Sequence, residues 1–229
     1  MCGIVAFKGN KEKTSEVIFE GLKLLEYRGY DSCGIGVIDN NEIKTFKWKG
    51  RVRNTEKRFI ESKIKSPIAI GHTRWATHGE PNDVNSHPIT SFNKKFAIVH
   101  NGIIENYREL KKVLIEKGYE FYTETDTEVL VNFIELCVSN AKNVDKGISY
   151  ALSKLEGAFG IVLIKRSNTD IMYAARKGSP LAFGKKRDNF FIASDATPII
   201  EYTKKIIYLD NSQLPVSYTH LTLPTIVGV

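Results

Sequence analysis

The sequence has no long apolar run. Each apolar stretch is soon interrupted by Lys, Glu, Asp or Asn, and none reaches the roughly 18 to 20 residues that a membrane-spanning helix needs. The first residues, MCGIVAF, also lack the basic segment, long apolar core and small-residue cleavage site of a secretory signal. We therefore expect a cytoplasmic protein with no membrane partner.

Cysteine is scarce. The three cysteines, Cys2, Cys33 and Cys137, are an odd number without CxxC spacing. This pattern excludes a disulfide framework and a cysteine zinc cluster, and it is typical of a reducing compartment.

Internal repeats and low-complexity linkers are missing as well. The 229 residues are 42% hydrophobic and 26% charged, which is typical of one soluble globular domain with a substantial core. The net charge of +7 raises the question of a polyanionic partner. The basic residues form short, scattered pairs without interleaved aromatics, so we expect no nucleic-acid partner.

Hydrophobic periodicity predicts strands at both ends of the chain and helices between them. Apolar residues at helical spacing predict helices at 14–27, 106–117, 127–140 and 144–155. Short β-branched runs predict strands at 2–8, 34–38, 43–48, 68–72, 96–100, 158–164, 171–175, 181–183, 190–193 and 206–209. This order favours an α+β fold with mainly antiparallel sheets.

Cysteine at position two is the first feature with chemical meaning. Removal of Met1 would leave Cys2 with a free α-amine, so that one residue holds both a nucleophile and a base. Taken alone, Cys2 is better explained as an inert, buried residue that begins a strand.

The segment GHTRWATHG at 71–79 places many hydrogen-bonding side chains at the end of a strand. Arg74 is suited to grip a carboxylate through a forked pair of bonds, and Thr77 and His78 are suited to orient it. The structural alternative is a rigid corner in which Trp75 fills the core.

Histidines offer a second interpretation of this region. A metal site would use the ring nitrogens of His72, His78, His87 and His100. No glutamate motif or cysteine pair accompanies them, so we expect no metal and no cofactor.

Two further motifs can be explained by local structure or by chemistry. Asn101 and Gly102 follow an apolar strand, where they make either a turn or an oxyanion hole from the amide side chain and the next backbone N–H. The segment ETDT at 124–127 either caps a helix or presents Asp126 to the ammonium group of an amino acid.

Five segments in chain order resemble the class II glutamine amidotransferases. They are MCGIVA at 1–6, LEYRGYDSCG at 25–34, GHTRWATHG at 71–79, HNGIIEN at 100–106 and TETDTEV at 123–129. The RGYDS and TRWATH versions resemble the glutamine–fructose-6-phosphate aminotransferases rather than the amidophosphoribosyltransferases or asparagine synthetases. The resemblance extends to about residue 210.

The resemblance implies an N-terminal nucleophile hydrolase fold, which is a four-layer αββα sandwich of mainly antiparallel sheets. It implies that Cys2 supplies nucleophile and amine base, and that Asn101 and Gly102 form the oxyanion hole. The implied reaction is attack of the Cys2 thiolate on the side-chain amide of L-glutamine, loss of ammonia and hydrolysis of the thioester to glutamate.

The resemblance also implies how glutamine is bound. Arg74 and Thr77 would hold its carboxylate, Asp126 its ammonium group, and Trp75 and His78 would line the pocket. In the complete enzyme the ammonia would convert fructose 6-phosphate to glucosamine 6-phosphate, and that enzyme would be a homodimer.

The end of the chain departs from the family pattern. We expect a glutaminase domain at 2–212, with the sugar isomerase domains that bind fructose 6-phosphate outside this chain. Residues 213–229, QLPVSYTHLTLPTIVGV, contain no Lys, Arg, Asp or Glu. They are predicted to be a poorly packed tail of non-native or misread sequence. The alternatives are the domain of another class II family, such as an amidophosphoribosyltransferase, and a glutamine-binding module without catalysis.

Overall fold

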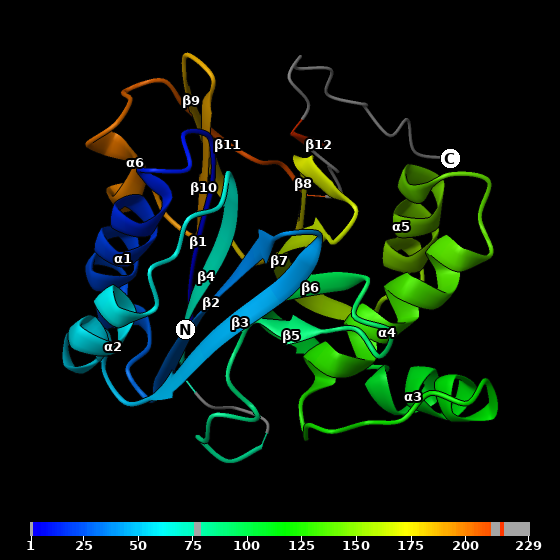
Figure 1. Cartoon of the computed structure of the whole chain (residues 1–229). Coiled ribbons are helices and arrows are strands. Elements are labelled where there is room, and N and C mark those ends of the chain that lie inside the picture. The colour runs from blue at the N-terminus through cyan, green and yellow to red at the C-terminus, as the bar shows by residue number, and fades with distance from the viewer. Residues whose placement is uncertain (1, 76–78, 212–215, 218–229) are drawn as a thin grey trace.

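The structure, a computed structural model, describes residues 2–75, 79–211 and 216–217. Two β-sheets face each other, and each is covered on its outer face by helices (Figure 1). The predictions for Met1, Thr77 and His78 lie outside the described residues, as does most of the predicted tail at 213–229.

The first sheet is built around the first strand of the chain. Strand β1 (Gly3–Lys8) pairs antiparallel with β10 on one side and with β4 on the other. The full order is β11-β9-β10-β1-β4-β2-β3, and every neighbouring pair is antiparallel. The other strands are β2 (Ser32–Asp39), β3 (Glu42–Lys49), β4 (Ile68–Arg74), β9 (Ala182–Lys186), β10 (Asn189–Ala193) and β11 (Ile206–Tyr208).

The second sheet has the antiparallel order β12-β8-β7-β6-β5. Its strands are β5 (Ile89–Thr90), β6 (Phe96–Ile104), β7 (Gly157–Lys165), β8 (Asn168–Lys177) and β12 (Val216–Ser217). Strand β12 is the part of the predicted tail that the structure describes, and it pairs with β8.

Successive side chains of a strand point to opposite faces of its sheet, so each sheet packs against the other sheet on one face and against helices on the other. In β1, Ile4 and Ala6 face the second sheet, whereas Val5 and Phe7 pack with residues of α1. The first helical layer contains α1 (Thr14–Leu24), α2 (Glu56–Glu61) and α6 (Thr197–Ile200), and the second contains α3 (Tyr107–Glu116), α4 (Asp126–Ser139) and α5 (Val144–Ser153) (Figure 1). The predicted four-layer αββα sandwich is confirmed.

The structure differs from the predicted elements at several points. Helix α1 ends at Leu24, and a short 3₁₀ helix, Glu26–Arg28, continues the predicted segment. The six-residue α2 was not predicted because it buries one apolar side chain, that of Phe59. Strand β6 runs on to Ile104 and contains the Asn101–Gly102 pair, which therefore does not form a turn.

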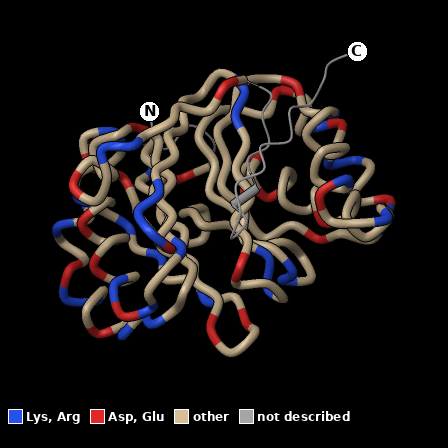
Figure 2. The backbone as a smooth tube through the Cα atoms, turned by 90° about the horizontal axis from the view of Figure 1, so that it is seen from above, with Lys and Arg blue, Asp and Glu red and all other residues tan. Residues whose placement is uncertain are grey.

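Charges of both signs cover the outer layers. Figure 2 shows Lys and Arg interspersed with Asp and Glu along the helices and loops. Among the described helices, none combines the length and the apolar character that crossing a bilayer requires.

Candidate active site

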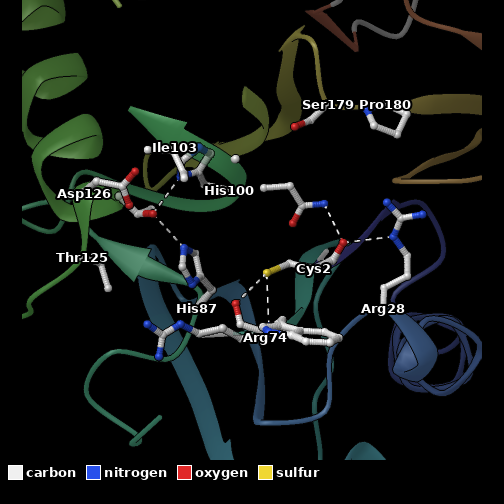
Figure 3. A pocket seen from close by; sticks show the side chains of 14 residues that line it. Cys2, Arg28, Arg74, His87, His100, Ile103, Thr125, Asp126, Ser179 and Pro180 are labelled. Carbon is white, nitrogen blue, oxygen red and sulfur yellow. Dashed lines mark hydrogen bonds between the residues drawn. The ribbon is translucent and has the colours of Figure 1, made fainter. Parts of the chain in front are cut away.

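A pocket of about 290 Å³ lies where the ends of β1, β4 and β6 meet the first turn of α4. Strand register brings the groups together: Gly3 is opposite Thr73 in the β1–β4 pair, so Cys2 and Arg74 lie one step further along the same edge. Figure 3 shows these side chains and those from β6 and α4 around the cavity. The full lining consists of Cys2, Arg28, Arg74, Trp75, His87, His100, Asn101, Gly102, Ile103, Thr125, Asp126, Thr127, Ser179 and Pro180.

The Cys2 residue is held by both its side chain and its carbonyl group. The Trp75 backbone N–H donates to Cys2 Sγ at 3.2 Å, and the thiol can donate to the Trp75 carbonyl at 3.5 Å. The Cys2 carbonyl accepts from Arg28 Nε at 3.1 Å and from Asn101 Nδ2 at 3.0 Å (Figure 3). These contacts come from three separate segments of the chain and hold both the backbone and the side chain of Cys2 in place.

Burial raises the pKa of the Cys2 thiol above its ordinary value, although the Trp75 N–H and the charges of Arg74 and Arg28 oppose this shift. Burial therefore favours the neutral thiol of Cys2 over the thiolate. Nucleophilic attack then requires a base close to the sulfur.

Arg74 ends β4, and its guanidinium group is tied to the segment that follows. Its Nη1 donates to the Glu80 carbonyl at 3.1 Å, and its Nη2 donates to the Gly79 carbonyl at 3.2 Å. Arg74 also carries the positive charge that a ligand carboxylate would need in the pocket.

Asn85 joins this segment to the start of α4. Its side-chain Nδ2 donates to the Glu80 carbonyl at 3.2 Å and to Glu124 Oε2 at 3.1 Å, and its Oδ1 accepts from the Glu124 N–H at 3.0 Å. Asn85 is itself buried. One amide therefore connects the chain around Arg74 to the chain that carries Asp126.

The first turn of α4 combines a helix cap with a pocket carboxylate. Thr125 is the N-cap residue, and its hydroxyl accepts from the Glu128 N–H at 3.2 Å. Asp126, which is 5% exposed, lines the pocket and accepts from the Ile104 N–H at 2.8 Å through Oδ2. The capping interpretation is thus confirmed for Thr125, and Asp126 remains available to a ligand through its second oxygen.

Gly102 occupies a position that a side chain cannot share. Its φ of +123° lies in the region that favours glycine, and an added Cβ would lie 2.0 Å from the Ala158 carbonyl oxygen. Asn101 next to it is 6% exposed, and both residues line the pocket.

Buried histidines lie behind the pocket. His72 and His87 stack with ring centroids 4.3 Å apart, and the Thr127 hydroxyl lies 2.9 Å from both His87 Nε2 and His100 Nδ1. Burial lowers the pKa of His72 to about 3 and that of His87 well below its ordinary value. Within the described residues, no group of three or more His, Cys, Asp or Glu side chains is arranged to hold a metal ion.

The structure brings the predicted site residues within the described part of the chain to one pocket. These residues are Cys2, Arg74, Trp75, Asn101, Gly102 and Asp126. The suggestion that Trp75 fills the core is wrong, because its side chain is 46% exposed and packs at the pocket beside Tyr30. The sequence analysis missed Arg28 and Asn85, whose roles arise from contacts between distant segments.

The sequence profile of the glutamine amidotransferase domain matches residues 72–201. The chain is 47% identical over 218 residues to the glutamine–fructose-6-phosphate aminotransferase (isomerizing) of Bacteroides thetaiotaomicron. That match covers 94% of this chain and 35% of the relative. The enzyme of the same name from Chlorobaculum tepidum is 43% identical over 235 residues, covering 99% of this chain and 38% of the relative. The chain thus spans little more than a third of the length of these curated relatives.

Solved structures share the fold. The structure of the allosteric regulatory enzyme of purine biosynthesis superposes with a TM-score of 0.82 at 26% identity, covering 94% of this chain and 46% of that one. The glutamine phosphoribosylpyrophosphate amidotransferase of B. subtilis gives a TM-score of 0.77 at 26% identity, covering 97% of this chain and 50% of that one. The predicted N-terminal nucleophile hydrolase fold is confirmed.

Proposed function

Because the chain belongs to the glutamine amidotransferase domain family, we propose that it hydrolyses L-glutamine to glutamate and ammonia through a thioester on Cys2. One observation carries the proposal. A single pocket contains a thiol, a side-chain amide, a guanidinium group and a carboxylate, contributed by both sheets and by α4. The thiol and the side-chain amide suit the side-chain amide of glutamine, the guanidinium group suits its α-carboxylate, and the carboxylate suits its α-ammonium group.

Recognition is the first step. The guanidinium group of Arg74 binds the α-carboxylate of glutamine, and Asp126 binds the α-ammonium group. Trp75 covers the ligand from the pocket rim. Thr77 and His78 complete the predicted binding set, and both lie outside the described residues.

Chemistry follows at the sulfur. The Cys2 thiolate attacks the side-chain amide carbon and forms a tetrahedral oxyanion, which accepts hydrogen bonds from Asn101 Nδ2 and the Gly102 N–H. The carbon–nitrogen bond breaks as the nitrogen takes a proton and leaves as ammonia. Water then attacks the thioester, which releases glutamate and restores the thiol.

A base is required because burial raises the pKa of the Cys2 thiol. We assign this role to the α-amine that Cys2 acquires when Met1 is removed, since an amine with a pKa of about 7.7 to 8 accepts a proton near neutral pH. Intact mass measurement reports the removal directly. Fully active protein that retains Met1 would contradict the assignment.

The ammonia has a proposed acceptor. The relatives carry the name glutamine–fructose-6-phosphate aminotransferase, and they match at higher identity than the phosphoribosylpyrophosphate enzyme. We therefore propose fructose 6-phosphate as the acceptor in a longer protein that contains this chain, and a homodimer as its state. With glutamine present, that protein should form glucosamine 6-phosphate and leave phosphoribosyl diphosphate unconsumed.

The Cys2→Ala variant tests the glutaminase proposal. Glutamate release should fall by at least about 10³-fold, because the covalent pathway is lost. Cys33→Ala is the matched control, since Cys33 is buried outside the pocket lining and burial raises the pKa of its thiol to about 11. Equal activity of the two variants would contradict Cys2 as the nucleophile.

A further inference from the structure

His72 connects the two sheets directly behind the nucleophile. It lies on β4 with the same alternation as Ile68 and Ile70, so its ring faces the second sheet. The side chain is 0% exposed. Its Nε2 lies 3.0 Å from Asn101 Oδ1 and 3.0 Å from the His100 carbonyl oxygen, both on β6.

The hydrogen-bond partners determine the orientation of the Asn101 amide. The Cys2 carbonyl can only accept a hydrogen bond, so the Asn101 atom 3.0 Å from it is the donor Nδ2. The amide oxygen Oδ1 must then face His72. A side-chain amide has one donor end and one acceptor end, and rotation by 180° would place oxygen against oxygen at Cys2.

The same reasoning fixes the His72 tautomer. Both atoms near Nε2 are acceptors, so Nε2 carries the ring proton. Nδ1 has no hydrogen-bond partner among the described residues, in agreement with a ring that is unprotonated there. Burial lowers the pKa of His72 to about 3, so the neutral ring persists across the physiological range.

We propose that His72 is a positioning residue, which holds the Asn101 amide so that Nδ2 faces Cys2. The proposal rests on the proposed glutaminase function. Nδ2 carries two hydrogens, so that one can bond to the Cys2 carbonyl while the other bonds to the oxyanion. Without His72, only the Cys2 carbonyl opposes rotation of the amide, and a rotated amide would present its oxygen to the oxyanion and repel it.

Two substitutions separate the hydrogen bond from the volume of the ring. His72→Gln retains an amide donor that can reach the position of Nε2, whereas His72→Leu retains bulk without a donor. We expect kcat to fall about 10- to 100-fold in His72→Leu, less than the 10²- to 10³-fold loss of an oxyanion donor, with KM unchanged. His72→Gln should stay within about fivefold of wild type.

Ile70→Ala is the matched control for lost stability. Ile70 lies two residues away on the same face of β4, and it is fully buried without a polar partner. Its truncation should lower the thermal midpoint while kcat stays near the wild-type value. If His72→Leu does not fold, His72→Asn replaces it, because that amide is too short to reach the Nε2 position.

Alkylation by iodoacetamide provides a readout without an oxyanion. The reaction displaces iodide from a saturated carbon, so it needs the Cys2 thiolate and not Asn101. The alkylation rate at Cys2, followed by peptide mass, should therefore stay close to wild type in His72→Leu. A parallel loss of alkylation and kcat, or an unchanged kcat, would overturn the proposal.

The Asn101 side-chain amide can also be observed without any turnover. In ¹⁵N-labelled protein its two protons should give separate, slowly exchanging signals in wild type and His72→Gln, and averaged or shifted signals in His72→Leu. Unchanged signals in His72→Leu would contradict the proposal. A wild-type chain without Cys2-dependent hydrolysis would instead contradict the proposed function, and the amide signals would still decide the role of His72.

Discussion

The two sides of the pocket are positioned by different means. The side that contains Cys2, His72 and Asn101, called the nucleophile side after the proposed role of Cys2, is held by strand register and by hydrogen bonds across the two sheets. The proposed recognition side contains Arg74 and Asp126 and depends on bonds that their side chains make to backbone groups. Arg74 binds the carbonyls of the segment after β4, and Asp126 binds the N–H of the last residue of β6. This difference predicts that changes on the first side alter kcat and that changes on the second alter KM.

Among the substitutions that test this difference between the two sides, Asn101→Ala should change the kinetic constants most. Removal of one oxyanion donor is expected to lower kcat by about 10²- to 10³-fold and to leave KM within a few-fold of wild type. Steady-state glutaminase kinetics measure both constants. A change confined to KM would place Asn101 on the recognition side instead.

Arg74→Lys should give the opposite pattern. Lysine keeps the charge and loses the planar fork, including the two bonds to the Gly79 and Glu80 carbonyls. We expect KM to rise by about 10- to 100-fold, since charge-assisted bonds contribute about 1.5 to 3 kcal/mol. A matched fall in kcat with constant KM would break the distinction between the two sides.

Acid should weaken the nucleophile side through its histidines. Burial lowers the pKa of His72 in the folded protein to about 3, whereas the value in the unfolded chain is about 6.5. As the pH falls below about 6.5, the unfolded chain therefore binds a proton that the folded protein does not. Proton binding stabilises the unfolded chain, so the free energy of unfolding falls. At about pH 5.5, His72 alone should lower the free energy of unfolding by about 1.2 kcal/mol relative to its value at pH 7.

Urea denaturation of wild type and His72→Gln at both pH values measures this contribution. The acid-induced loss should be smaller in the variant by about 1.2 kcal/mol, because glutamine does not titrate. His87, whose pKa is also lowered by burial, should maintain part of the acid sensitivity in both proteins. Identical losses would show that His72 is not buried as a neutral ring.

Asn85→Ala should change the kinetic constants least, and it tests whether contacts behind the pocket position the recognition side. The variant loses the three bonds to Glu80 and Glu124, and neither partner is a catalytic group. We expect KM for glutamine to rise about three- to tenfold with kcat retained, as the spacing between Arg74 and Asp126 relaxes. An unchanged KM would show that each ligand contact is positioned independently.

The sequence could predict those features that depend on local pattern. Alternating and helical apolar spacing located the central strands and the four long helices, and Thr125 was recognisable as a cap. Motif resemblance then identified the pocket residues. The conformation of the Asn101–Gly102 pair was harder to predict, because this dipeptide is typical of turns. Here pairing with β7 keeps it in a strand.

Other features arise only from packing. Arg28 and His72 lie within two of the quoted motifs and Asn85 lies in none. All three contact residues far away in the sequence, so no local pattern predicts what each side chain binds. The His72 side chain is also ambiguous on its own, since a buried histidine can bind a metal, stack or donate one hydrogen bond. Its partners on β6 decide between these roles.

The central position of β1 has a consequence for synthesis in the cell. Cys2 and β1 are synthesised before every other described strand, yet β1 lies between β4 and β10, and β10 ends at Ala193. At about 5 to 20 residues per second, the strand must wait on the order of 10 to 40 seconds for its second neighbour. The strand next to Cys2 is therefore made long before both of its neighbours are present. Until β10 is synthesised, the Cys2 thiol stays exposed unless another segment or a cellular factor covers this strand.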